Sequence, residues 1–228
     1  MVELNDVARL LDPGPLPLEM GVQRLPSGQL HVAARTLMAG VTGEAFDWWF
    51  RFAPDTEQYA WWHPLDHVSS SWRETNPRTH VGSTHIVQER LGDPDGEVHD
   101  LQINFCDPDE IFGPGVASDA RARGDVSSLV CGFIGFGKEP PRDAEGRPLG
   151  ARLAHIGRDT PNGMLLRSRF WLGAGLPLGP EELAERVPET LGLGLMQHAH
   201  TEFLFLARVL PALFEAENRH TRRPVSPW

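Results

Sequence analysis

The chain has 228 residues, of which 40% are hydrophobic and 23% charged, and its formal net charge is −10 at pH 7. This length can enclose one sizeable hydrophobic core, and the composition is that of an ordinary globular protein. The negative charge argues against a nucleic-acid surface, which needs clustered Lys and Arg, and no apolar run is long enough to span a bilayer.

The N-terminal residues and the cysteines together predict a cellular compartment. Residues 1–11 include acidic side chains and no long apolar stretch, so they do not resemble a signal peptide. Cys106 and Cys131 lie in apolar runs that look like strands, and we expect both to be buried free thiols. Free thiols suit a reducing compartment, so we expect a cytoplasmic protein with no membrane partner.

The first 30 residues are predicted to form an extended N-terminal arm, because prolines and glycines interrupt every apolar run in them. Residues 31–38 alternate between apolar and polar side chains, which predicts the first strand. Thr42 is a suitable N-cap for a helix over residues 44–52. A second short helix is predicted near residues 55–62.

Two histidines follow in residues 61–67, which read Trp-Trp-His-Pro-Leu-Asp-His. Proline is tolerated in the first turn of a helix, so a helix could begin at His63 or Pro64. Such a helix would place His63 and His67 on one face, one turn apart. Two imidazoles on one helical face form half of a metal site. The alternative is that they are two unrelated surface histidines.

From about residue 80 the apolar side chains alternate with a period close to two, which indicates a meander of antiparallel strands. Turn signals lie between these runs, at residues 93–96 and 161–163. The predicted strands cover residues 80–91, 98–105, 127–136, 152–158 and 164–172.

The C-terminal part predicts a short helix from Pro180 and one long, very apolar helix over residues 194–218. A curved antiparallel sheet that holds one long C-terminal helix is the helix-grip architecture, of class α+β. We therefore expect an arm over residues 1–30, one domain over 31–218 and a flexible tail over 219–228.

Glu202 is an anomaly on the apolar face of the long helix. A buried carboxylate is costly unless a charged group pairs with it. A metal cation would neutralise Glu202 and explain its position. The alternative is a salt bridge to Arg167 or Arg169 of a predicted strand. His198 lies one turn before Glu202, and a lone core histidine is more often hydrogen-bonded than a ligand.

Glu89 ends another strand-like run and shares a face with His85 and Val87 by alternation. A glutamate in a strand is usually solvent-exposed. Glu89 becomes a candidate only because a metal site would need a further ligand.

Three segments of the chain resemble the 2,4-diacetylphloroglucinol hydrolases and the related phloretin hydrolases, which are zinc-dependent carbon–carbon hydrolases. They are Trp-His-Pro-Leu-Asp-His over residues 62–67, Gly-Met-Leu-Leu-Arg-Ser-Arg-Phe-Trp-Leu-Gly over 163–173, and His-Ala-His-Thr-Glu over 198–202. The resemblance runs from roughly residue 30 to 218. It implies a helix-grip fold of the Bet v 1-like type.

The resemblance also implies a set of site residues, carried over position by position. The zinc ligands it implies are His63, His67, Glu89 and Glu202. The catalytic residues it implies are His198, Asp66 and His155. The substrate-binding candidates are Trp62, Phe170 and Tyr59. Phe170 stands where the family uses a tyrosine to hold a phenolic hydroxyl, and Tyr59 is the one tyrosine of the chain.

The function that follows is hydrolysis of the bond between an acyl group and an electron-rich ring or β-dicarbonyl carbon. Zinc would act as a Lewis acid and lower the pKa of a bound water toward neutrality. The leaving carbon needs a proton, for which His198 and His155 are candidates, while Asp66 would orient the water or a substrate hydroxyl. The partner would be a small aromatic or polyketide-like substrate.

Two other functions fit the same residues. Histidines with carboxylates also suit Fe²⁺ or Mn²⁺, so a non-haem iron oxygenase is one alternative. A helix-grip carrier that binds a hydrophobic ligand without catalysis is the other, and it predicts a cavity but no metal. Members of the resembling family are dimeric, so a homodimer is a further expectation.

Overall fold

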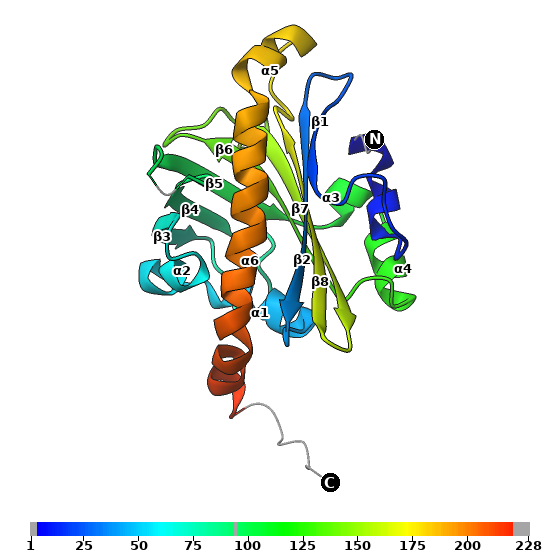
Figure 1. Cartoon of the computed structure of the whole chain (residues 1–228), viewed down its shortest axis with the longest axis vertical. Coiled ribbons are helices and arrows are strands. Elements are labelled where there is room, and N and C mark those ends of the chain that lie inside the picture. The colour runs from blue at the N-terminus through cyan, green and yellow to red at the C-terminus, as the bar shows by residue number, and fades with distance from the viewer. Residues whose placement is uncertain (1–3, 94, 221–228) are drawn as a thin grey trace.

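The computed structural model describes residues 4–93 and 95–220, and it shows a curved sheet around one long C-terminal helix (Figure 1). The sheet has eight strands, every neighbouring pair antiparallel, in the order β1-β2-β8-β7-β6-β5-β4-β3. The helix-grip fold expected from the sequence is therefore confirmed.

The elements have the following bounds. The strands are β1 Gly21–Arg24, β2 Leu30–Ala39, β3 His67–Arg73, β4 Thr84–Glu89, β5 His99–Cys106, β6 Ser128–Phe136, β7 Gly150–Thr160 and β8 Gly163–Leu172. The helices are η1 Leu4–Leu11, α1 Gly43–Phe52, α2 Thr56–Trp62, α3 Asp109–Phe112, α4 Val116–Ala122, α5 Pro180–Arg186 and α6 Glu189–Asn218.

Strands β4 to β8 confirm the meander predicted from residue 80 onward, and β2 confirms the first predicted strand. β7 and β8 form a hairpin in which Thr160 pairs with Gly163. Gly163 has a φ of 130°, and a Cβ built there would lie 2.2 Å from the backbone oxygen of Met38 in β2. Only glycine fits this position, because the hairpin passes close to the neighbouring strand.

The predicted helices near residues 44–52 and 55–62 are confirmed as α1 and α2. The side chain of Thr42 accepts a hydrogen bond from the N–H of Ala45, as expected of an N-cap. Asp55 caps α2 in a capping box with Gln58, whose side chain accepts from the N–H of Asp55. These caps fix where α2 begins and therefore where its last turn presents Trp62.

The prediction of a helix that begins at His63 or Pro64 is wrong. α2 ends at Trp62, and His63 is its extended C-cap, with φ −146° and ψ 93°. The ring of Pro64 disfavours the α conformation in the residue before it, so His63 leaves the helix. The chain turns over residues 64–66 and enters β3 at His67.

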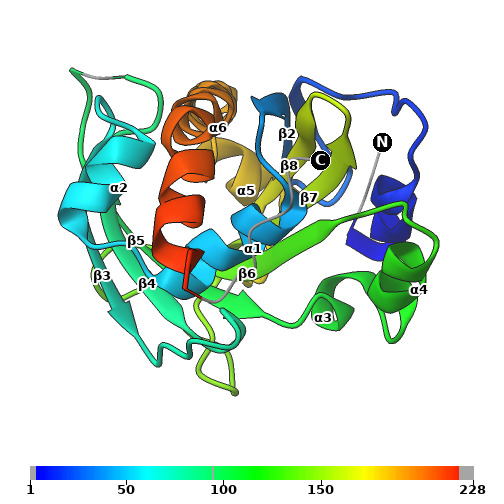
Figure 2. The ribbon, with the colours of Figure 1, turned by 90° about the horizontal axis from the view of Figure 1, so that it is seen from below.

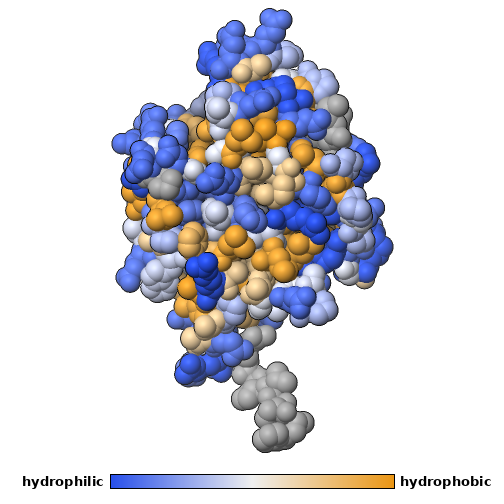
Figure 3. Space-filling view, in the orientation of Figure 1, coloured by the Kyte–Doolittle hydropathy of each residue, from blue (hydrophilic) through white to orange (hydrophobic). Residues whose placement is uncertain are grey.

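Helix α6 lies in the concave face of the sheet and is in contact with β1, β2, α1 and α2 (Figures 1 and 2). Among the described residues, no helix has the length and apolar character that crossing a membrane requires. Apolar side chains also gather along the outer side of α6 (Figure 3), where Leu193 and Leu204 are exposed. The homodimer stays a prediction.

The convex face of the sheet carries a second hydrophobic cluster, covered by η1, α3 and α4 (Figure 2). α3 and α4 lie within residues 107–124, between two predicted strands, and no helix was predicted there. Cys106 and Cys131 belong to this cluster, face each other across the β5–β6 pair, and are buried and free as expected.

Two buried arginines of β8 hold the N-terminal segment against this convex face. Arg167 and Arg169 are 4% and 0% exposed. The Glu19 carboxylate lies 2.8 Å from Nη2 of Arg167 and 3.3 Å from Nη2 of Arg169. Arg167 also donates to the backbone carbonyls of Leu10, Asp12 and Gly14. The segment is thus anchored by charge-assisted hydrogen bonds.

The division into arm, domain and tail stays a prediction. Residues 4–24 contain η1 and β1 as well as extended chain, and β1 pairs with β2 at the edge of the sheet. Residues 1–3 of the expected arm and 221–228 of the expected tail lie outside the described residues.

Candidate functional site

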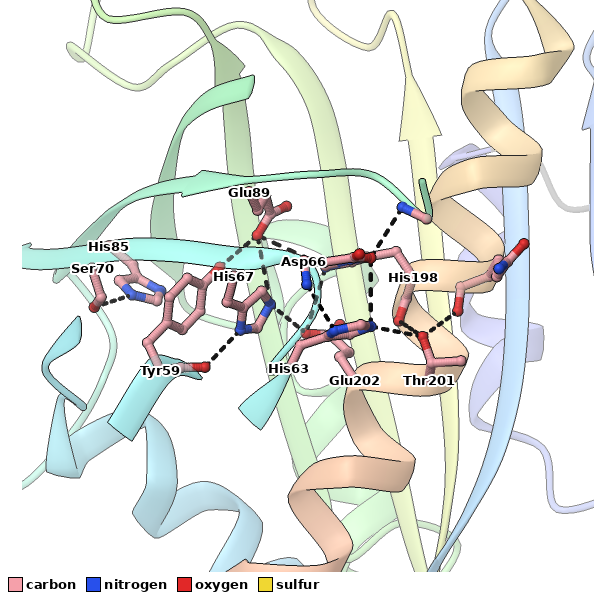
Figure 4. Close-up of polar contacts among 12 residues, drawn as sticks. Tyr59, His63, Asp66, His67, Ser70, His85, Glu89, His198, Thr201 and Glu202 are labelled. Atoms are coloured by element: carbon pink, nitrogen blue, oxygen red, sulfur yellow. Dashed lines mark hydrogen bonds and ion pairs between the residues drawn. The ribbon is translucent and has the colours of Figure 1, made fainter. Parts of the chain in front are cut away.

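Four buried side chains converge in the concave face of the sheet (Figure 4), and we call them the His/Glu cluster: His67, Glu89, His198 and Glu202. Nε2 of His67 lies 3.8 Å from Oε2 of Glu89 and 3.7 Å from Oε2 of Glu202. Nε2 of His198 lies 3.8 Å and 3.9 Å from the same two oxygens. The candidate ligand atoms of His67, His198 and Glu202 thus lie within 4.8 Å of one another, and Oε2 of Glu89 lies 3.8 Å from both imidazole nitrogens.

The fold explains this convergence. His67 begins β3 and pairs directly with Glu89 at the end of β4, so both side chains leave the sheet at one place. A bulge between His67 and Ser69 shifts the register of β3 there. His198 and Glu202 lie one helical turn apart on the face of α6 that is turned to the sheet.

Hydrogen bonds outside the cluster orient both of its imidazoles. Nδ1 of His67 lies 2.9 Å from the backbone oxygen of Tyr59, which can only accept, so Nδ1 carries the proton. Nε2 of His67 then turns a lone pair toward the carboxylates, and it has no hydrogen-bond partner among the described residues. Nδ1 of His198 is held in the same way by Oδ2 of Asp66 at 2.9 Å. This pattern is typical of histidines that ligate a metal.

The cluster is electrostatically strained without a cation. Burial lowers the pKa of His198, but Glu89, the hydrogen bond to Asp66 and Glu202 outweigh it and raise that pKa to about 9. Burial raises the pKa of Glu202 to about 8, although His198 opposes this. Burial and the neighbouring His198 hold the pKa of His67 well below its ordinary 6.5. The cluster thus binds protons that a divalent cation would displace.

The salt bridge considered for Glu202 is wrong. Arg167 and Arg169 lie on the convex face and pair with Glu19. The ion pairs of Glu202 in the described part of the chain are with His67 and His198.

His63, a predicted ligand, lies beside the cluster and uses both ring nitrogens elsewhere. Its Nδ1 accepts from the backbone N–H of Asp66 at 3.1 Å. Its Nε2 lies 2.9 Å from the hydroxyl oxygen of Thr201. That hydroxyl donates to the backbone oxygen of Gln197 at 2.8 Å, so it accepts from Nε2–H of His63. Neither nitrogen offers a free lone pair to the cluster.

Asp66 forms a second buried group with His63 and His198, whose candidate ligand atoms lie within 4.8 Å of one another. Oδ2 of Asp66 accepts from His198 and from the backbone N–H of Gly92 at 3.1 Å. Burial opposes the charge of Asp66, but the hydrogen bond from His198 lowers its pKa below the ordinary value. Asp66 is therefore a charged group that fixes the position of His198.

Tyr59 joins the cluster from α2. Its hydroxyl donates to Oε2 of Glu89 at 2.5 Å, and its ring stacks on His67 with centroids 3.6 Å apart. Burial and the charge of Glu89 raise the pKa of Tyr59 well above 10, so the phenol stays protonated. The sequence offered no basis for this contact, because the residues are 30 positions apart.

An apolar cavity adjoins the cluster. Trp62 and Phe170, predicted to contact substrate, are among its aromatic walls. The described polar side chains that line it are Tyr59, His85, Glu89, His155, His198 and Glu202. A largely apolar cavity with a few convergent polar groups is typical of a site for a small organic molecule.

His155 lies in the cavity wall outside the cluster. Its Nδ1 is 2.9 Å from the hydroxyl oxygen of Ser168, and its ring packs edge-on against Phe170 and Phe203. Burial lowers the pKa of His155 to about 3, so its ring is neutral near pH 7.

The structure thus brings together His67, Glu89 and Glu202 of the predicted ligands and places His198 with them, but not His63. Ser70, whose hydroxyl oxygen lies 2.9 Å from Nε2 of His85, and Thr201, which fixes the tautomer of His63, were missed by sequence reasoning. Serine and threonine carry no spacing signal for such a role.

The family model described as "DAPG hydrolase PhiG domain" matches residues 2–215 of this chain. A 2,4-diacetylphloroglucinol hydrolase from Pseudomonas protegens is 28% identical over 240 residues, which cover 92% of this chain and 72% of that protein. A phloretin hydrolase from Eubacterium ramulus is 28% identical over 212 residues, which cover 83% and 69%.

Similar solved structures share little sequence with this chain. The crystal structure of protein Ms6760 from Mycobacterium smegmatis has a TM-score of 0.41 and 16% identity, and covers 85% of this chain and 95% of its own. The solution structure of a protein from Arthrobacter aurescens has a TM-score of 0.46 and 14% identity, and covers 83% and 92%.

Proposed function

Because the chain belongs to the DAPG hydrolase family, we propose that it is a metal-dependent hydrolase of carbon–carbon bonds. The bond cleaved would join an acyl group to a phenolic, phloroglucinol-like ring or to a β-dicarbonyl carbon. The observation that carries the proposal is the His/Glu cluster, which stands beside an apolar cavity of the kind that takes small aromatic molecules.

We propose that His67, Glu89, His198 and Glu202 bind one divalent cation. The unpartnered Nε2 of His67, buried next to two carboxylates, supports this, because a buried polar atom without a partner is costly. His63 is left out of the proposed set because its nitrogens already bond to Asp66 and Thr201.

The donor set also bears on which metal binds. Two imidazoles and two carboxylates suit zinc, and they also suit Fe²⁺ or Mn²⁺. The resemblance of the chain to zinc hydrolases makes zinc the proposed ion. When bound, such an ion acts as a Lewis acid on carbonyl oxygens and lowers the pKa of water toward neutrality.

The chain's own residues then have separate tasks. Asp66 fixes the ring of His198, and Tyr59 donates to Glu89, so both contacts hold donor atoms at their places. The walls formed by Trp62 and Phe170 exclude water from the acyl-bearing ring. Cleavage leaves a negative charge on the ring carbon, which must receive a proton. His155, which lies in the wall beside Phe170 and is neutral, would take up the proton that the attacking water gives up and deliver it to that carbon.

Metal analysis of protein purified without a histidine tag tests this function most directly. Near-stoichiometric zinc is expected, and chelation should abolish cleavage of an acylphenol or β-diketone to a carboxylic acid. Glu202→Gln and His67→Ala should each lose both the metal and the activity. His200→Ala is the matched control, because His200 lies on the same helix but bonds to Thr36 instead of the cluster.

Other results of these experiments would favour one of the alternative functions, the oxygenase or the carrier. Full activity in Glu202→Gln or His67→Ala would refute the proposed ligand set. Oxygen consumption with iron bound would indicate an oxygenase. Ligand binding without metal and without turnover would indicate a carrier.

A further inference from the structure

We propose that His85 determines substrate specificity: the Nδ1 of its ring accepts a hydrogen bond from a hydroxyl group of the substrate. This inference rests on the proposed function in one respect, since it takes the cavity beside the His/Glu cluster as the substrate site. His85 projects from β4 next to Tyr59 and Ser70 (Figure 4).

The contacts of Ser70 fix which nitrogen of His85 carries the proton. The hydroxyl oxygen of Ser70 lies 2.8 Å from the backbone oxygen of Pro54 and 2.9 Å from Nε2 of His85. A carbonyl oxygen cannot donate, so at this distance the one hydroxyl proton must point to Pro54, because otherwise two sets of lone pairs would repel. Ser70 therefore accepts a hydrogen bond from Nε2–H of His85.

The ring of His85 is neutral. It is 1% exposed, stacks on Trp72 with centroids 4.0 Å apart, and meets the ring of Tyr59 edge-on at 5.1 Å. Burial lowers the pKa of His85 to about 3. A neutral ring has one protonated nitrogen, so with Nε2 protonated, Nδ1 is an acceptor only.

Nδ1 of His85 is open to the cavity. The ring lines the cavity, and within the described part of the chain nothing bonds to Nδ1. The histidines there whose unpartnered nitrogens are fully sealed are His31, His67 and His80, and His85 is not among them. The accessible side of Nδ1 is therefore the cavity that the ring lines.

This acceptor has few competitors in the cavity. The hydroxyl of Tyr59 already donates to Glu89, and His155, whose Nδ1 is bonded to Ser168, has the separate proposed task of carrying the proton to the leaving carbon. The cavity residues outside the cluster are otherwise apolar. A ligand that leaves Nδ1 of His85 unpaired loses a hydrogen bond to water without replacement, whereas a ligand with a hydroxyl there does not. An ether or carbonyl oxygen at that point is disfavoured.

The position of His85 defines the class of substrate. His85 and Glu89 share one face of β4, with Val87 between them. The side chains nevertheless converge on Tyr59, whose ring meets His85 edge-on with centroids 5.1 Å apart and whose hydroxyl donates to Glu89, so the acceptor lies about one aromatic ring away from the His/Glu cluster. The substrate is therefore an acyl compound that carries a phenolic or enolic hydroxyl about one ring's width from the bond that is cleaved.

Binding of two ligands without an acyl group tests this apart from hydrolysis. The probes are 4-ethylphenol and its methyl ether, 4-ethylanisole, followed by the tryptophan fluorescence of the metal-loaded protein. The wild type should prefer the phenol about tenfold, which is the ratio expected of one neutral hydrogen bond. His85→Phe, which keeps the stacking on Trp72, should bind both ligands equally.

His31→Phe is the matched control, since it replaces a buried histidine that stacks on Trp171 outside the cavity, and it should keep the tenfold preference. An unchanged preference in His85→Phe, or an equal loss of preference in His31→Phe, would overturn the assignment, as would no preference in the wild type. A two-bond ¹H–¹⁵N correlation spectrum gives a second readout. It should show His85 protonated at Nε2, and protonation at Nδ1 would refute the argument whether or not the protein is a hydrolase.

Discussion

Glu202→Gln is expected to abolish metal binding and yet to stabilise the metal-free protein. Glutamine has nearly the same shape as glutamate but carries no charge. Glu202 is 7% exposed, and its nearest polar neighbours in the cluster include Glu89, a second carboxylate bound by the same two histidines. Removing one of two buried carboxylates relieves a repulsion that only a cation would otherwise offset.

The magnitude follows from the pKa of Glu202, which burial raises from 4.5 to about 8. A carboxyl whose pKa is raised by folding lowers the stability as pH rises above 4.5, until pH reaches about 8. At pH 7 this amounts to about 3 kcal/mol, from 2.5 pH units at 1.36 kcal/mol each. His198 loses a negative neighbour in the variant, so the net gain should be roughly 1–2 kcal/mol.

Urea unfolding of chelator-treated wild type and Glu202→Gln measures this gain. The difference in unfolding free energy should be present at pH 7 and should shrink to below about 1 kcal/mol at pH 5, close to the ordinary pKa of a glutamate. A variant less stable than the wild type at pH 7 would refute the reasoning. An equal gain at both pH values would show that the effect has nothing to do with ionisation.

Three further predictions concern histidines. His67→Ala should lose zinc, whereas His63→Ala should keep it with about tenfold weaker affinity, because His63 only supports the ligands. Equal loss of zinc from both variants in an elemental analysis would contradict the proposed ligand set. Zinc uptake at pH 7 should release protons because the pKa of His198 is about 9, so the calorimetric heat should depend on the buffer's ionisation enthalpy. Burial and Arg169 lower the pKa of His31 from 6.5 to about 4, so stability is lost as pH falls from 6.5 toward 4. His31→Phe should gain about 2 kcal/mol at pH 5 relative to pH 7 in urea unfolding, and no such difference would contradict the burial argument.

Periodicity predicted most of the sheet because its central strands are rich in apolar residues, and β6 is buried on both faces over nearly its whole length. β3 was missed because it reads His-Val-Ser-Ser-Ser-Trp-Arg, with few apolar residues, and lies at the edge of the sheet. β1 was missed because it is only four residues long. Edge strands need little hydrophobic pattern, so alternation says little about them.

Only part of the site could be predicted from the sequence, because periodicity gives the face on which a residue lies but not its hydrogen bonds. The positions of Glu89 and Glu202 follow from strand and helix periodicity, and the structure brings them together. The spacing of His63 and His67 suggested two equivalent ligands. What separates them is which ring nitrogen has a free lone pair, and this depends on hydrogen bonds to Thr201 and to the backbone of Tyr59. No spacing rule contains that information.

The anchoring of Glu19 between Arg167 and Arg169 has a consequence for how this protein can be shortened. Deleting the residues up to and including Glu19 would leave Arg167 and Arg169 without their counter-ion on the convex side of β8. The concave side of the same strand carries Phe170, which lines the cavity. Breaking a buried ion pair by removing one partner typically destabilises by about 3–5 kcal/mol, a large fraction of a domain's stability. The proline-rich beginning of the chain thus stabilises the strand that forms one wall of the cavity, although none of its described residues lines that cavity.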